Sequence, residues 1–189
     1  MTKIIGLGTV TSAHAQLSFS QESNLINGNF NSGLDCAVDM NGDFLDDVVI
    51  VTGSGIEIHY QQQNGSFTLQ EFAMDIEYSP NWSIAAGDLD NNGFNDLLLG
   101  NGDRVTFLIA NADGTAYSQD LHPEDIFSQR STFADIDNDG NLDAFVCHDV
   151  DQSHPYRSDG NGGMVLDQNL IETIDLPGNY AALWVDYDN

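Results

Sequence analysis

The chain has 189 residues, with 30 Asp and Glu against four Lys and Arg, a formal net charge of −26, and 24 of its acids are Asp. This balance argues against nucleic acids and anionic membrane surfaces as partners, and no stretch approaches the ~20 apolar residues of a membrane span. A hydrophobic content of 41% is too high for a disordered acidic tail, and the excess of Asp indicates turns and oxygen-rich loops.

The first fifteen residues have the layout of a secretory signal. Lys3 precedes a mildly apolar run over 4–10, and Ala13-His14-Ala15 supplies a small-x-small cleavage site before Gln16. We therefore expect residues 1–15 to be a signal peptide and the mature chain, 16–189, to be extracellular, whether secreted, at the cell surface or periplasmic. An ordinary first strand is the alternative, because the apolar run is short and contains two glycines.

An internal repeat follows. Three stretches share one pattern, in which an acidic loop leads into three or four apolar residues. The loops begin at Asp39, Asp88 and Asp135, and a fourth begins at Asp186, so that the leading aspartates are 49, 47 and 51 residues apart. Self-similarity at this period is typical of repeat architectures.

Each acidic loop is followed by strand-like segments. Ile56–Tyr60 and Val105–Ile109 come next in the first two units, and turn-forming residues such as 63–66 and 111–114 precede a further short strand. Roughly four short strands per ~50 residues is the period of a propeller blade. The sequence predicts an all-β fold of short antiparallel strands, with about three β-propeller blades and the start of a fourth. The only helical turn expected is at 123–127.

The loops carry the chemistry of a cation site. Oxygen-bearing side chains recur at the first, third, fifth and ninth positions, and glycine stands at the sixth position of the second and third loops. Carboxylate and amide oxygens on a tightly curled backbone suit Ca²⁺, a hard cation with six to eight oxygen ligands. The predicted ligands are Asp39, Asn41, Asp43 and Asp47; Asp88, Asp90, Asn92 and Asp96; Asp135, Asp137, Asp139 and Asp143; and Asp186 and Asp188.

The three complete loops are expected to differ in calcium affinity. The third has four carboxylates, which predicts the tightest site, whereas the first has Phe44 at the glycine position and Gly42 two residues earlier. Calcium would act structurally by removing the repulsion among packed carboxylates. Metal-free loops rich in Asx turns are the alternative.

Other residues are assigned simpler roles. Cys36 and Cys147 are expected to be separate thiols, and Trp82 and Trp184 to pack in the blade core rather than form a sugar platform. Cys147 also stands beside His148. We interpret these two as ordinary residues near a loop, which is simpler than a catalytic or transition-metal site. No catalytic residue is assigned.

The repeat resembles the FG-GAP/VCBS repeats of integrin-α-like β-propellers. The third unit is closest to secreted proteins of the ASPIC/UnbV and cartilage-acidic-protein type, because Tyr156–Gly162 resembles their Y-R-N-x-G-x-G hairpin, with Ser158 for Asn. Met164 stands where that group has an aromatic residue. The resemblance implies calcium in each blade and a propeller of about seven blades. The chain is therefore expected to be an N-terminal fragment, with the rest of the propeller missing.

These observations predict a secreted, calcium-binding scaffold for binding or adhesion, with an extracellular protein or glycan as ligand. The alternative is the N-terminal part of a calcium-dependent propeller enzyme, a polysaccharide lyase or hydrolase, whose catalytic residues lie outside this chain. A purely structural spacer with calcium as its only ligand is a third possibility.

Overall fold

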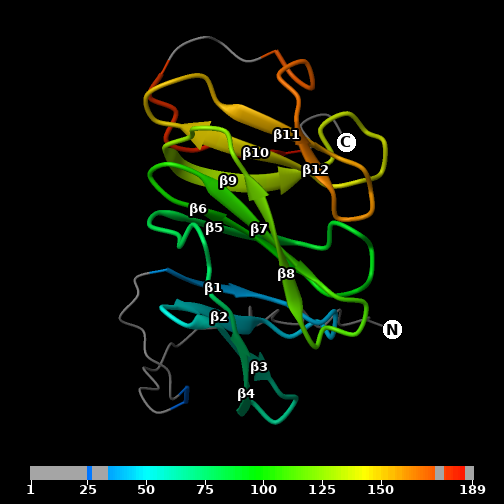
Figure 1. The fold of residues 1–189 in the computed structure, drawn as a ribbon. Coiled ribbons are helices and arrows are strands. Elements are labelled where there is room, and N and C mark those ends of the chain that lie inside the picture. The colour runs from blue at the N-terminus through cyan, green and yellow to red at the C-terminus, as the bar shows by residue number, and fades with distance from the viewer. Residues whose placement is uncertain (1–24, 27–33, 173–176, 186–189) are drawn as a thin grey trace, which may run out of the picture.

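The computed structural model describes residues 25–26, 34–172 and 177–185, and this part of the chain contains twelve strands and no helix (Figure 1). No described segment could therefore cross a membrane as a helix. The expected signal peptide, 1–15, and the fourth-loop residues Asp186 and Asp188 lie outside the described residues. The expected helical turn at 123–127 is wrong. Five residues gain little from a lone helical turn, and the backbone N–H of Ile126 instead donates to the carbonyl of Asp103 at 2.9 Å.

The twelve strands form three four-stranded antiparallel sheets, each built from strands consecutive in the chain. Sheet one contains β1 (Asp35–Val38), β2 (Asp47–Thr52), β3 (Gly55–Gln61) and β4 (Phe67–Ala73). Sheet two contains β5 (Ser83–Gly87), β6 (Asp96–Gly100), β7 (Val105–Ala110) and β8 (Tyr117–His122). Sheet three contains β9 (Ser128–Ala134), β10 (Asp143–His148), β11 (His154–Ser158) and β12 (Met164–Leu166). The predicted all-β architecture of four-stranded units is confirmed.

The sheets are stacked in chain order, and sheet two lies between the other two (Figure 1). The first strands of the three sheets are neighbours, since β5 contacts both β1 and β9. This is the arrangement of successive propeller blades, whose first strands lie side by side around an axis.

The core lies between the sheets and has two parts. Between sheets one and two, Val49 and Ile58 pack with Leu97 and Leu99. Between sheets two and three, Leu98 packs in a second cluster that includes Tyr156. Alternate residues of β6 thus enter opposite interfaces, which explains why the strand is buried along its whole length and carries three consecutive leucines.

Two expectations about single residues have different outcomes. Cys36 and Cys147 are free thiols, as predicted. Trp82 does not pack in the core, because it precedes β5 at the edge of the sheet, where its side chain is 50% exposed. Its ring packs against Phe127 in a tilted arrangement, with centroids 4.7 Å apart. Trp184 is half-buried beside Phe145, with centroids 5.8 Å apart.

Candidate metal centres

Each acidic loop joins the first strand of its sheet to the second. Loop one (residues 39–47) connects β1 to β2, loop two (88–96) connects β5 to β6, and loop three (135–143) connects β9 to β10. Because β1, β5 and β9 are neighbours, the loops that follow them lie at one end of the stacked sheets.

All three loops share one backbone conformation, with left-handed residues at their fourth and sixth positions. The fourth positions are Gly42 (φ 73°), Asn91 (57°) and Asn138 (58°). The sixth positions are Phe44 (66°), Gly93 (92°) and Gly140 (93°). The expected glycine curl at the sixth position is therefore present even where the residue is Phe. The left-handed fourth position was not anticipated, and Gly42 occupies that position instead of substituting for the missing glycine.

The first aspartate of each loop organises the curl by accepting backbone hydrogen bonds. Asp88 accepts the N–H of Asn92 on Oδ1 at 3.0 Å and the N–H of Gly93 on Oδ2 at 2.9 Å. Asp39 and Asp135 accept the equivalent two amides of their own loops. This carboxylate is consequently fixed inside the loop by the backbone.

The ninth aspartate ties the loop to the sheet. Asp96 is fully buried, and it accepts the N–H of Leu89 at 2.8 Å on one oxygen and the N–H of Ala110 at 2.7 Å on the other. Asp47 and Asp143 make the corresponding pairs of bonds.

The ionised form of this buried carboxylate is disfavoured. Burial raises the pKa of Asp96 to about 6, and the charges of Asp90 and Asp88 act in the same direction, against the two backbone donors. Burial likewise raises the pKa of Asp47 and Asp143. A bound cation would reverse this penalty.

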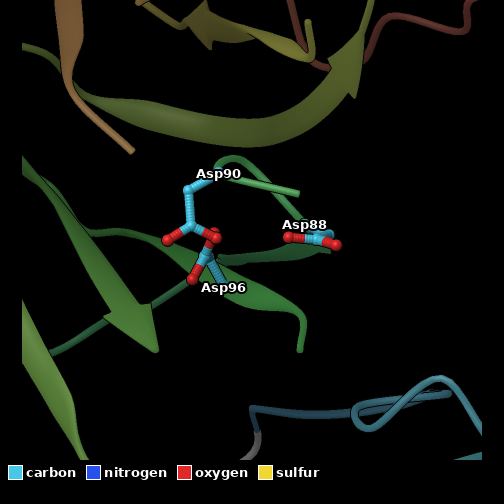
Figure 2. A group of neighbouring side chains, drawn as sticks. All are labelled: Asp88, Asp90 and Asp96. Carbon is cyan, nitrogen blue, oxygen red and sulfur yellow. The ribbon is translucent and has the colours of Figure 1, made fainter. Parts of the chain in front are cut away.

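The first, third and ninth residues converge in loops two and three. One ligand atom from each of Asp88, Asp90 and Asp96 lies within 4.8 Å of the others. Figure 2 shows these three neighbouring side chains. Asp135, Asp137 and Asp143 form the same group in loop three. Oxygens that surround one Ca²⁺ at ~2.3–2.6 Å can be up to about 5 Å apart, so both groups fit this ion.

Loop one and the fifth positions differ from that arrangement. In loop one the third residue is Asn41, so its first, third and ninth residues bring two carboxylates and one amide. The fifth residue of each loop accepts the N–H of the seventh, at 2.7–2.9 Å; these residues are Asp43, Asn92 and Asp139. Asp139 stands outside the carboxylate group of loop three.

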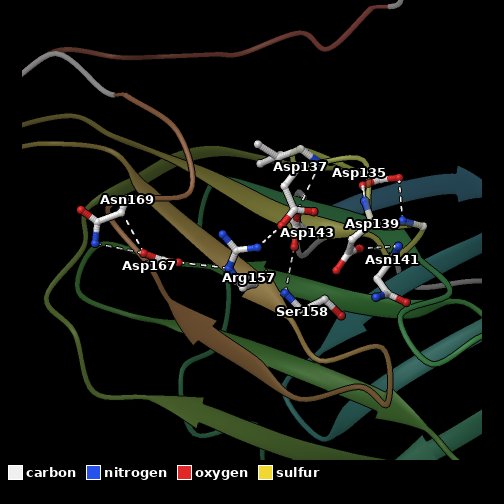
Figure 3. Close-up of polar contacts among 11 residues, drawn as sticks. Asp135, Asp137, Asp139, Asn141, Asp143, Arg157, Ser158, Asp167 and Asn169 are labelled. Carbon is white, nitrogen blue, oxygen red and sulfur yellow. Dashed lines mark hydrogen bonds and ion pairs between the residues drawn. The ribbon is translucent and has the colours of Figure 1, made fainter.

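Two residues at the loops were not predicted. Arg157 on β11 forms ion pairs with Asp137 of loop three and with Asp167 (Figure 3). Asn95 of loop two donates its side-chain N–H to the carbonyl of Asp39 at 2.6 Å, which joins loops one and two. Arg157 belongs to a motif visible in the sequence, whereas nothing in the repeat marks Asn95.

Cys147 and its histidine neighbours do not form a further centre. The rings of His148 and His154 are 5.7 Å apart. Within the described ranges, only the two aspartate groups bring three acidic, His or Cys side chains within ligand distance of one another.

Comparison with known proteins agrees with this geometry. The model of the FG-GAP-like repeat matches twice, at residues 39–99 and 88–146, which together are more than half of the chain. Among solved structures, the chain is similar to a lectin from Agrocybe aegerita, solved with regard to its specific recognition of non-reducing terminal N-acetylglucosamine. The TM-score is 0.54 and the identity 17%, and the match covers 78% of this chain and 39% of the lectin chain. No curated protein matches.

Proposed function

This chain belongs to the FG-GAP-like repeat family, and on that premise we propose that it is a secreted, calcium-stabilised propeller scaffold that binds extracellular glycan or protein ligands. The observation that carries the calcium assignment is the convergence of the first, third and ninth aspartates in loops two and three. Localisation outside the cell is proposed from the N-terminal sequence alone.

Calcium has a structural role in this proposal. The ion would sit where the loop, the second strand and the third strand meet, because the ninth aspartate bonds to all three. It would offset the repulsion among the carboxylates and the cost of burying Asp96. At an extracellular-module affinity of ~10⁻⁴ M and ~1–2 mM calcium, each filled site would add about 1.5 kcal/mol to the free energy of unfolding.

Calorimetric titration tests the assignment. We expect saturable calcium binding by the wild-type chain and a melting temperature several degrees higher in 2 mM calcium than in EGTA. Asp90→Asn should weaken the loop-two site, because it replaces one of three converging carboxylates by a neutral amide, as at Asn41 of loop one. Asp103→Asn is the matched control, since Asp103 is an exposed turn residue at the start of the β6–β7 connection.

The two variants separate a metal site from a general charge effect. Equal loss of calcium binding in Asp90→Asn and Asp103→Asn would mean that calcium responds only to the net charge. Absence of both binding heat and thermal stabilisation in the wild type would overturn the calcium assignment.

A glycan ligand is supported by the exposed Trp82 and its half-buried neighbour Phe127. Aromatic faces open to solvent can stack on the apolar faces of sugar rings. Trp82 is exposed, and its neighbour Gly102 adds no side chain beside the ring, where a Cβ would lie 3.5 Å from it. The pair precedes β5 and β9, at the end of these strands opposite the acidic loops. The lectin similarity shows a shared fold, so N-acetylglucosamine-terminated oligosaccharides are a reasonable first probe.

Tryptophan fluorescence tests this contact, because the chain has only two tryptophans. Titration with chitotriose should shift the emission of the wild type and of Trp184→Phe saturably, and should leave Trp82→Ala unchanged. A saturable shift that persists in Trp82→Ala would exclude Trp82 and Phe127 as the contact. The absence of binding to any member of a glycan array would overturn the glycan ligand.

A further inference from the structure

Loop three differs from the other two loops because a positively charged side chain lies beside it. Gln61, Ala110 and Ser158 are equivalent residues, because each donates its backbone N–H to the ninth aspartate of its loop. The residues immediately before them are therefore equivalent too, and they are Tyr60, Ile109 and Arg157. Among the three described sheets, only sheet three places a positive charge at this position.

The guanidinium of Arg157 is held in a definite orientation. Its Nε donates to Asp167 at 3.0 Å, and its Nη1 is paired with Asp137 (Figure 3). Asp167 is itself fixed by the backbone N–H of Asn169 at 2.9 Å. The bond from Asn169 and the contact with Arg157 lower the pKa of Asp167, so this anchor stays ionised.

The ion pair engages one of the three converging carboxylates. In loop two, the third-position carboxylate of Asp90 accepts the N–H of Asn92, at 3.2 Å, and faces no arginine. In loop three, the equivalent Asp137 faces Arg157, whose charge cannot be removed by deprotonation. Loop three also has four aspartates where loop two has three, so the arginine balances the additional carboxylate.

We propose that Arg157 is an affinity-determining residue of loop three: a tethered cation that keeps the loop ordered without calcium and weakens its calcium binding. The proposal rests on the calcium role proposed above. A calcium ion that enters loop three must share Asp137 with a guanidinium, and it is repelled by that charge, whereas loop two imposes neither cost. Loop two is consequently the tighter site, which reverses the ranking expected from the number of carboxylates.

Neutralising Arg157 provides the test. In Arg157→Gln we expect the calcium affinity of loop three to rise about tenfold, as the removal of a unit charge several ångströms from a divalent ion predicts. The melting temperature in EGTA should fall, and the gain on adding calcium should increase. The side chain is 40% exposed, so the fold should tolerate the change. Arg157→Met is a second neutral variant with the same expectation.

Two controls isolate the charge and the loop. Arg157→Lys keeps the positive charge and should retain an affinity within about twofold of the wild type. Arg104→Gln removes an arginine that pairs with Asp125, away from the acidic loops, and should leave calcium affinity unchanged. The rise in calcium affinity in Arg157→Gln should also disappear when Asp135→Asn is added, because the second change disables loop three itself.

The outcomes distinguish this proposal from the calcium assignment. If the wild-type chain binds calcium at loop two and folded Arg157→Gln and Arg157→Met show unchanged or weaker loop-three affinity, the role of Arg157 is overturned and calcium binding stands. If no variant binds calcium at any loop, the failure is that of the proposed function.

Discussion

Phe44 has an unusual combination of backbone conformation and exposure. Its φ is 66°, in the left-handed region, and its side chain is 95% exposed. Loops two and three place Gly93 and Gly140 at the same position. A residue with a Cβ costs about 1–2 kcal/mol in this conformation, and the exposed ring recovers none of that cost through packing.

Phe44→Gly should therefore stabilise the protein. We expect an increase of about 0.5–1 kcal/mol in the free energy of unfolding, because the relief of strain exceeds the extra entropy of an unfolded glycine. Urea denaturation in EGTA measures this change without a contribution from calcium binding.

The reciprocal control is Gly93→Ala, which should destabilise the protein by a similar amount. A Cβ at Gly93 meets no atom within 4 Å, so its cost comes only from the left-handed φ of 92°. A loss of stability in Phe44→Gly would mean that the aromatic ring has a packing role that outweighs the strain.

At the scale of residues, the sequence predicts most but not all of the site. The spacing of the aspartates identifies Asp88, Asp90 and Asp96 as a group, because oxygen ligands at alternate positions of a curled loop point toward one centre. It does not predict the left-handed conformation of Asn91, since Asn tolerates that region without requiring it. Nor does it predict the pairing of Arg157, because residues 137 and 157 meet only once β10 and β11 are paired.

The acidic loop and its strands form one hydrogen-bonded element. The ninth aspartate reaches the second residue of its own loop and the third strand of its sheet, so the loop cannot move independently of the hairpin that follows. Protonation of this group would be coupled to the proposed calcium binding, because a cation requires the ionised carboxylate.

Calcium stabilisation should therefore depend on pH. With its pKa raised to about 6, Asp96 stabilises the metal-free fold most below its unfolded pKa of 3.8, and this contribution is lost as the pH rises through 6. We expect the difference in melting temperature between calcium and EGTA to be small at pH 4.5 and to reach its full size above pH 7.

The difference in melting temperature between calcium and EGTA is a better measure than either melting temperature alone. Hydrogen bonds from Thr115 and Asn169 lower the pKa of the exposed Asp113 and of the half-buried Asp167, which gives stability the opposite dependence on pH. Asp113 lies outside the acidic loops and should contribute equally with and without calcium. A calcium effect of constant size from pH 4.5 to 7.5 would contradict the role assigned to Asp96.

The sequence predicts the strands more reliably than it predicts the segments that connect them. Apolar runs such as that of β6 identify buried strands, and glycine or asparagine clusters identify the turns between them. The expected helical turn at 123–127 failed for a tertiary reason. Ile126 is fully buried in the core between sheets two and three, and an extended backbone is needed to bring it there from the end of β8.

At the scale of the whole molecule, stability depends on the stacking of sheets. Sheet two contributes leucines to both interfaces, so each of its faces is covered by an outer sheet. The period of about 50 residues predicts this repetition, but the alternation of Leu97, Leu98 and Leu99 between two clusters needs the sheet positions. A run of three leucines cannot by itself show which side each faces.

The five-residue length of β5 has a consequence for how such a protein can diversify. Its first residue follows Trp82, and its last precedes loop two, so these features are separated by about 17 Å of rigid strand. Under the proposed function, substitutions at the aromatic end would change what the surface recognises without altering the proposed ion sites. A lineage, or an engineer, could then vary the proposed recognition at one end of the strand while the loops at the other end stay constant.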